Sequence, residues 1–361
     1  MYSAYFLIPA LNGSGRAHLA TIGKGAVQPL APLGFAFGRP SAVSDEYVAG
    51  LLPVCATRAR VYRARLSPGG DVISGRFVVL PPHLRVHALA LHGPFLYVGG
   101  AWSPRAFGAG IGAAAGRVDL RAARPVWELL ALPVPAAPGK ALDDVLADAQ
   151  GLVLVDNIVF PKYLFAYDWP VGESLPINPQ VVELPFRRVY EHIVKGQLSA
   201  EYVVLLSTSA GMDDVGTYVS VLRRRDWAPV VVLAHTQCRE ELWDEEARTF
   251  KGEESPRSRH PFDLALQGHT LVLACPGALL CADLRAFPVR PVAPSDDLQE
   301  PDYTGVDLSS GDLPVGVHWE ALASHEQPTA ICFVGPGQLL GTVGNILNQG
   351  GGWAWLKNLG D

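Results

Sequence analysis

The stretch GLVLVDNIVFPKYLFAYDW, residues 151–169, sets the pattern that the rest of the chain repeats. It contains two apolar runs, at residues 152–155 and 163–167, with a break around Pro161 between them. Both runs are too short for helices and are rich in β-branched or aromatic residues, so they predict strands buried on both faces. A third run, at residues 181–184, follows a segment rich in turn-forming residues. The stretch therefore predicts an antiparallel sheet of short strands.

The same order of strands recurs along the chain. The repeats align on their second strands, which begin near Phe95, Leu152, Val203, Leu271 and Leu339. These positions are 57, 51, 68 and 68 residues apart, a mean of 61, so 361 residues hold about six repeats. Recurrence on this scale, with about four short strands in each repeat, predicts an all-β fold. Within that class it indicates a β-propeller of six blades, with seven blades as the alternative.

The third strands of several repeats end alike, with VDL at residues 118–120, AYD at 166–168 and ADL at 282–284. With these repeats the chain resembles the broad β-propeller superfamily, in the manner of WD40, kelch and YVTN-type repeats. The resemblance covers most of the chain but is generic, since a single Gly-His pair, at residues 268–269, matches the WD40 signature. It implies the architecture, with residues 1–361 as one domain, and it implies no particular activity.

Composition narrows the class of protein. Hydrophobic residues make up 49% of the chain and charged residues 18%, which indicates a well-buried globular protein. The net charge of -6 gives no overall electrostatic attraction for nucleic acid. No apolar run reaches the 18 or so residues that a membrane-spanning helix needs, so we expect no membrane association. The five cysteines are widely scattered and form no disulfide or zinc pattern, which favours a cytoplasmic protein.

A closed propeller must pair or cover the strand edges of its first and last sheets. The last repeat, which contains Trp353 and Trp355, lacks an outer strand, whereas residues 26–30 offer a strand to spare. Many propellers close by mixing strands from the two termini in one blade. We therefore expect the residues before about Gly34 to complete the last blade.

Three insertions lengthen the loops between strands, at residues 100–116, 238–260 and 294–328. Within the second of them, residues 238–250 are predicted to form a short helix. Its apolar stripe consists of Leu242, Trp243, Ala247 and Phe250. Insertions on a repeat scaffold commonly lie on a binding face.

No sequence motif of a catalytic site occurs. The string GAGIGAAAG at residues 108–116 contains G-x-G-x-x-A, but the next predicted element is a strand rather than the helix that a dinucleotide site needs. We interpret it as a loop. G-x-x-x-x-G-K-[ST], G-x-S-x-G and H-E-x-x-H are absent from the chain. The sequence therefore predicts no catalytic residue and no cofactor.

An alternative reading is a calcium-dependent hydrolase with its site at one mouth of the central channel. Six-bladed hydrolases of the lactonase type are similar in holding calcium with Asp, Asn and Glu side chains from several blades. On this reading the oxygen ligands are Asp156, Asn157, Asp213 and Asp214. The competing interpretation is that these residues make the turns that Asp and Asn favour.

The favoured reading is a non-catalytic scaffold that binds another protein through its loops and insertions. Tryptophan and arginine dominate the energetics of protein interfaces. The expected contacts are Trp102, Arg105, Trp243 and Trp319, one or two from each insertion. The alternative is that each of these side chains packs its own insertion against the scaffold.

Overall fold

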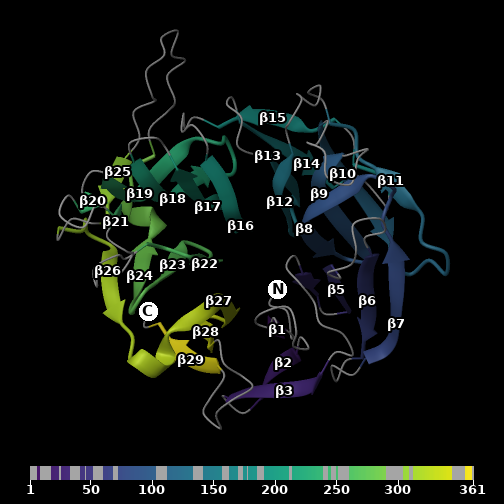
Figure 1. Cartoon of the computed structure of the whole chain (residues 1–361), viewed down its shortest axis with the longest axis horizontal. Helices are drawn as coiled ribbons and strands as arrows, with labels where there is room; N and C mark the ends of the chain where they lie inside the picture. Colours follow the sequence, from purple (N-terminus) through teal and green to yellow (C-terminus); the bar gives the residue numbers. More distant parts are fainter. Residues whose placement is uncertain are drawn as a thin grey trace. The chain divides into compact units, whose positions relative to one another are not determined.

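The computed structural model (Figure 1) consists of β-strands, with two 3-10 helices, Leu284–Ala286 and Ser324–Glu326, among the residues that it describes. The described residues are 6–8, 18–23, 26–32, 41–44, 46–51, 60–67, 72–102, 112–132, 141–156, 162–169, 174–176, 178–184, 191–210, 214–238, 243–244, 249–250, 260–289, 304–308, 312–343 and 354–359. None of the helices in these ranges has the length and hydrophobicity to span a membrane. One compact unit contains the strands up to β15 and a second contains the strands from β16 onward.

The described residues of the first unit form one three-stranded and three four-stranded sheets, all antiparallel. The first sheet has β1 (Phe6–Ile8), β2 (His18–Gly23) and β3 (Ala26–Pro32). The second has β4 (Ser41–Val43), β5 (Tyr47–Leu51), β6 (Arg60–Leu66) and β7 (Val72–Val79). The third has β8 (Leu84–His92), β9 (Phe95–Trp102), β10 (Gly112–Asp119) and β11 (Trp127–Leu129). The fourth has β12 (Leu142–Ala147), β13 (Gly151–Asp156), β14 (Tyr163–Asp168) and β15 (Gln180–Glu183).

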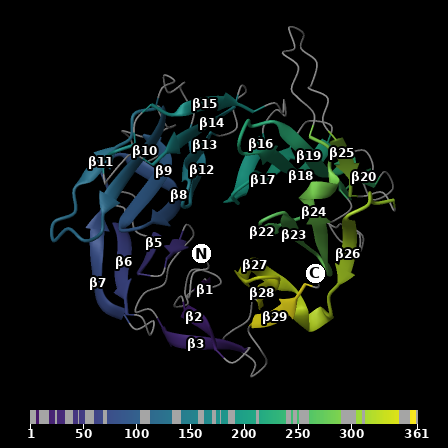
Figure 2. The ribbon, with the colours of Figure 1, turned by 180° about the vertical axis from the view of Figure 1, so that it is seen from behind.

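The second unit repeats this plan, which Figure 2 shows from behind. Its first sheet has β16 (Glu191–Leu198), β17 (Tyr202–Ala210), β18 (Asp214–Arg223), β19 (Pro229–Cys238) and the parallel strand β25 (Thr304–Asp307). The next has β22 (Asp263–Gln267), β23 (Thr270–Cys275), β24 (Ala278–Asp283) and β26 (Val317–Ala321). The last has β27 (Pro328–Gly335), β28 (Gln338–Val343) and β29 (Ala354–Asn358). A separate pair is formed by β20 (Trp243–Asp244) and β21 (Thr249–Phe250).

The core of each unit lies between successive sheets. In the first unit, one buried cluster joins the sheets β4–β7 and β8–β11 through residues such as Val61 and Leu96, and another joins β8–β11 to β12–β15 through Tyr97 and Leu152. All six residues of β13 are buried, as the apolar run at residues 152–155 predicted. The predictions of an all-β propeller fold and of six blades with about four antiparallel strands each are confirmed, since the repeats of the sequence correspond to the six sheets from β4 to β29 and the three-stranded sheet β1–β3 precedes them.

Several expectations about the chain ends and insertions differ from the structure. The predicted closure is not shown, because β3 pairs with β2 in a sheet of its own and the described partner of β29 is β28. The helix predicted over residues 238–250 is wrong: Trp243 and Phe250 are directly paired in the two-stranded ladder of β20 and β21. Residues 294–328 are more than an insertion, since they supply β25 and β26. The glycine-rich loop is shorter than expected, because β10 begins at Gly112.

The first strands of several sheets share a β-bulge near their beginning. The extra residue is His87 in β8, Asp143 in β12, Val194 in β16 and Thr329 in β27. A bulge places two residues opposite one and bends the strand locally. In the first unit the Nδ1 atom of His87 lies 3.1 Å from the carbonyl oxygen of Leu142, so two of these first strands are joined at their bulges.

Candidate functional site

The proposed calcium ligands are only partly within the described residues. Asp156 ends β13 and is 1% exposed, so its carboxylate is part of the interior of the first unit. Asp214 begins β18, while Asn157 and Asp213 lie outside the described residues. In the ranges that the structure describes, no group of three or more His, Cys, Asp or Glu side chains is placed to hold a metal ion. The calcium set stays a prediction.

The four residues predicted to contact a partner have different surroundings. Trp102 ends β9 half-buried, with its ring edge-on to His83 at 5.9 Å between ring centroids. Trp319 in β26 is also half-buried and packs against the apolar core of the second unit, which agrees with the packing alternative. Trp243 lies in β20, and Arg105 lies outside the described residues. The set of four contacts therefore stays a prediction, with the side-chain surroundings described for Trp102 and Trp319.

Two cysteines of the second unit lie in its apolar interior. Cys275 in β23 and Cys281 in β24 are both buried. Burial raises the pKa of the Cys281 thiol to about 11, so this group is protonated at neutral pH. A protonated buried thiol is a packing group rather than a catalytic one.

The outer strand of the second sheet, β7, exposes an unusual number of apolar side chains. The exposed fractions are 42% for Val72, 58% for Ile73, 43% for Phe77 and 58% for Val79, whereas Val78 on the opposite side is buried. The strand is last in the sheet order, and β6 is its only neighbour among the described strands. Strand edges of this kind are usually blunted because they are sites of association.

The exposed apolar side chains continue onto β11 and the turn before it. Val126 is 73% exposed and Leu129 is 54% exposed. The two outer strands belong to successive sheets, and the end of β7 meets the beginning of β11, where the indole nitrogen of Trp127 donates a hydrogen bond of 2.7 Å to the carbonyl of Val79. We call this set the outer-strand surface. It consists of Val72, Ile73, Phe77, Val79, Val126 and Leu129.

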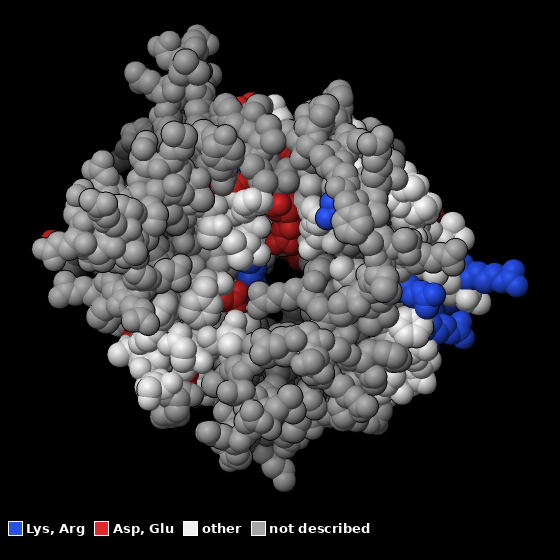
Figure 3. Space-filling model, viewed as in Figure 1, with Lys and Arg blue, Asp and Glu red and all other residues white. Residues whose placement is uncertain are grey.

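Arginines border the outer-strand surface, and Figure 3 shows basic side chains projecting from this edge of the unit. Arg76 is exposed in the middle of β7, and its guanidinium is 3.5 Å from the carbonyl oxygen of Ala123. Arg121 and Arg124 are exposed in the turn between β10 and β11. Arg121 makes a bidentate ion pair with Asp119, which lowers the pKa of that carboxyl. Arg76 and Arg124 make no ion pair with any described residue.

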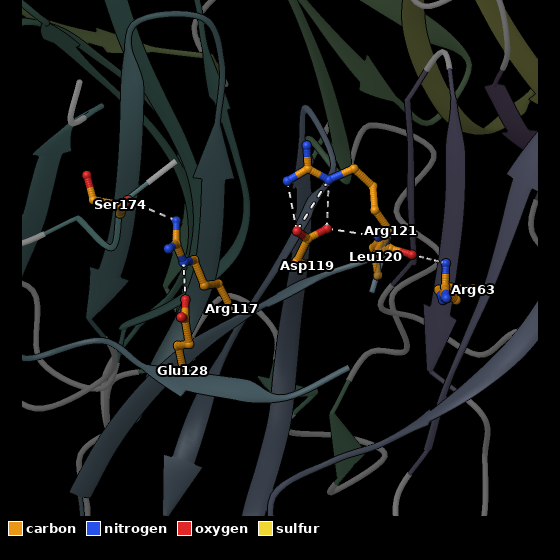
Figure 4. A network of polar contacts seen from close by, with 7 residues as sticks. All are labelled: Arg63, Arg117, Asp119, Leu120, Arg121, Glu128 and Ser174. Atoms are coloured by element: carbon orange, nitrogen blue, oxygen red, sulfur yellow. Dashed lines mark hydrogen bonds and ion pairs between the residues drawn. The ribbon is translucent and has the colours of Figure 1, made fainter. Parts of the chain in front are cut away.

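A network of buried arginines holds the turn in place (Figure 4). Arg63 of β6 is 7% exposed and donates to the carbonyl of Leu120, which ties the second sheet to the turn. Arg117 of β10 donates to the carboxylate of Glu128 at 2.7 Å and to the carbonyl of Ser174 at 3.0 Å. Backbone and side-chain anchors on both sides therefore fix the position of the exposed arginines and of β11.

Sequence reasoning missed the outer-strand surface. The sequence VISGRFVV of β7 contains the apolar run that predicted a strand, but an apolar run is equally typical of a buried strand. Two signals were available: this strand comes last in its repeat, where a propeller blade has its outer edge, and Arg76 interrupts the apolar residues.

Two histidines of the second unit lie close together, His235 buried and His260 half-buried. His235 in β19 is 3% exposed, and its ring centroid is 3.9 Å from that of His260. Burial, together with the neighbouring His235, lowers the pKa of His260 to about 4. Burial also lowers the pKa of His235, against the opposing influence of Asp307. Both rings are therefore neutral in the folded unit at neutral pH.

This pair predicts a loss of stability in mild acid. In the unfolded chain a histidine takes up its proton near pH 6.5, whereas His260 in the folded unit does so near pH 4. The unfolded state therefore binds more protons in this window, and the free energy of unfolding falls as the pH is lowered through it. The His260→Phe variant should show a smaller fall, measured by urea unfolding at several pH values. His318→Gln, at an exposed position of β26, is the matched control; equal pH dependence in both variants would contradict the assignment.

No protein-family model matches the sequence, and no curated protein matches it. Solved structures show distant likeness. A Trp149Ala mutant of the Synechocystis apocarotenoid oxygenase is 8% identical, with a TM-score of 0.41 over 89% of this chain and 74% of that one. A candidate 6-phosphogluconolactonase of Bacteroides uniformis is 13% identical, with a TM-score of 0.41 over 87% and 98%. Prolyl oligopeptidase B of Galerina marginata is 10% identical, with a TM-score of 0.39 over 78% and 37%. Likeness at this level gives no evidence about activity.

Proposed function

We propose that this chain is a binding module for another protein and that the partner binds the outer-strand surface. One observation carries the proposal: Ile73 and Val79 are each 58% exposed on an outer strand whose only described neighbour is β6. Contiguous exposed apolar side chains on a soluble protein mark interaction sites, and a strand edge adds main-chain groups that a partner can pair with. The arginines around the surface supply the polar rim that such interfaces have.

The proposal keeps the scaffold role expected from the sequence and adds a different surface to it. Trp102, at the end of β9, and Trp243, in the β20–β21 pair, stay candidate contacts. Trp319 is less favoured as a contact because it packs on the core of its own unit. The cytoplasmic location stays a prediction from the cysteine pattern.

The test is partner recovery with a matched pair of variants. The double substitution Ile73→Glu and Val79→Glu places two charges on the outer-strand surface, and Val315→Glu places one at an apolar residue that is 92% exposed in the second unit. We expect the unmodified chain and Val315→Glu to recover the same partner from the native cell extract. The double variant should bind the purified partner at least about tenfold more weakly, since a desolvated charge costs more than 1.4 kcal/mol.

The control for folding is thermal melting, because charges on an exposed strand should leave the melting temperature within a few degrees of the unmodified chain. Equal binding by the double variant and by Val315→Glu would refute the proposed surface.

A further inference from the structure

The residues of the outer-strand surface favour a particular class of partner segment. Its centre is an extended strand of eight residues without proline, and it is bordered by arginines. We propose that the occupant is an extended acidic segment of a partner protein, with alternating apolar residues, that pairs with β7 as an added strand. This inference rests on the proposed function and names the class of partner.

The edge of β7 has the geometry for strand addition. In an antiparallel ladder the N–H and C=O groups of one residue point to the same side, and those of alternate residues point to the same edge. The carbonyl of Val79 accepts a hydrogen bond from the Trp127 indole, a donor outside the sheet of β7. This contact identifies the outer edge of β7. It also shows that a donor from outside the sheet can hydrogen-bond to a main-chain carbonyl there, as the N–H groups of an added strand would. The exposed side chains of Val72 and Ile73 lie farther along the same strand, where alternate apolar residues of an added strand would meet them.

The charges select an acidic occupant. Two described carboxylates beside the surface are already held by arginines, Asp119 by Arg121 and Glu128 by Arg117. Arg76 and Arg124 have no ion pair among the described residues. Exposed cations of this kind attract carboxylates and repel a basic segment, which gives specificity and a faster association rate.

The same charges disfavour a second copy of the chain as the occupant. A two-fold interface brings the same patch of each copy together, so Arg76 and Arg124 of both copies would be gathered in one interface. Like charges held close across an interface are unfavourable. Nucleic acid is disfavoured because the apolar side chains of the surface would have no counterpart on phosphate groups.

Synthetic peptides test the inference directly. The probe is a fluorescent peptide of alternating valine and glutamate; a second peptide has lysine in place of glutamate, and a third has a central proline that removes a main-chain donor. We expect the acidic peptide to bind in fluorescence anisotropy and each of the other two to bind at least about tenfold more weakly. Binding should weaken as salt rises from about 50 to about 200 mM, because exposed charges are screened.

Variants connect the binding to the residues. The double variant with Arg76→Gln and Arg124→Gln should bind the acidic peptide about tenfold more weakly, a loss of about 1.4 kcal/mol in binding free energy. The matched control is Arg225→Gln, at an exposed arginine in a turn of the second unit. Equal binding of the acidic and lysine peptides, or tight binding of the proline peptide, would overturn the inference, and so would concentration-dependent dimerisation in ultracentrifugation that Ile73→Glu abolishes.

The two proposals fail in different ways. If partner recovery depends on Ile73 and Val79 but the acidic peptide does not bind, the surface is a partner site and the acidic strand is wrong. If partner recovery is unaffected by substitutions in β7, the proposed function itself is wrong.

Discussion

Replacing Asp263 by alanine should lower the free energy of unfolding of the second unit by about 3–5 kcal/mol, because it breaks a buried ion pair by removing one partner. Asp263 in β22 is 5% exposed. Its Oδ1 atom accepts a hydrogen bond of 2.5 Å from the Lys195 ammonium of β16, and its Oδ2 atom accepts one of 2.7 Å from the main-chain N–H of Ile331 in β27. One carboxylate thus joins the first strands of three successive sheets. Its loss leaves a charge and a main-chain donor without their partner.

Three further variants separate the contribution of the ion pair with Lys195 from that of the hydrogen bond to Ile331. Asp263→Asn keeps an acceptor for the Ile331 N–H, so it should lower the free energy of unfolding less than Asp263→Ala does. The double variant Lys195→Met with Asp263→Asn removes both charges and should recover part of the lost stability. Glu320→Ala is the matched control, because Glu320 pairs with Lys357 at 2.6 Å near the surface, where such pairs contribute about 1 kcal/mol or less. The Lys195 side chain is 30% exposed, so water limits the cost toward the lower end of the range. Urea midpoints measure the differences, and a loss for Asp263→Ala no larger than for Glu320→Ala would contradict the assigned role.

The strands that the sequence predicted are those whose pairing partners are close in the chain. Leu152 and Leu154 are each 0% exposed, and both belong to the buried cluster that β12–β15 shares with β8–β11. A buried strand of this kind appears in the sequence as a continuous apolar run, so it can be predicted without information about distant residues. The repeat spacing then gives the number of blades.

Strands with polar residues or distant partners were not predicted. The sequence EHIVKGQL of β16 contains charges that look exposed, yet Glu191 is buried and accepts a hydrogen bond from Ser207, and Lys195 pairs with Asp263. The strand β25 pairs with β19 from far along the chain, and no local pattern specifies such a contact. Long-range pairing is therefore the information that a pass along one sequence lacks.

The wrong helix over residues 238–250 has a specific cause. Residues seven apart, such as Trp243 and Phe250, share one face of a helix. In a hairpin the same two residues are directly opposite each other, as the register of β20 and β21 shows. The apolar spacing was thus compatible with both structures, and the short length of the segment gave no means of choosing.

The outer-strand surface could not be predicted from the sequence for a related reason. The sequence contains Ile73, Arg76 and Val79, but their exposure depends on β7 being the outermost strand of its sheet. Tryptophan and arginine in insertions were a general expectation for interfaces. The surface found here is instead made by apolar residues of a regular strand, which propensity assigns to the interior.

The second large effect is expected at Gly100, whose replacement by alanine should cost about 3 kcal/mol or more. Gly100 in β9 pairs with Val86, next to the bulge at His87 in β8. A Cβ atom on Gly100 would lie 1.8 Å from the carbonyl oxygen of Arg85, a main-chain atom that cannot rotate away as a side chain can. The two strands must therefore separate locally, which disrupts the ladder between β8 and β9 and the contact of His87 with Leu142.

The matched control is Gly305→Ala in β25, where no atom lies within 4 Å of the added methyl group and the change should be neutral or stabilising by up to about 1 kcal/mol. Urea unfolding followed by tryptophan fluorescence gives both values, and similar midpoints for the two variants would show that the bulge does not require a glycine opposite it.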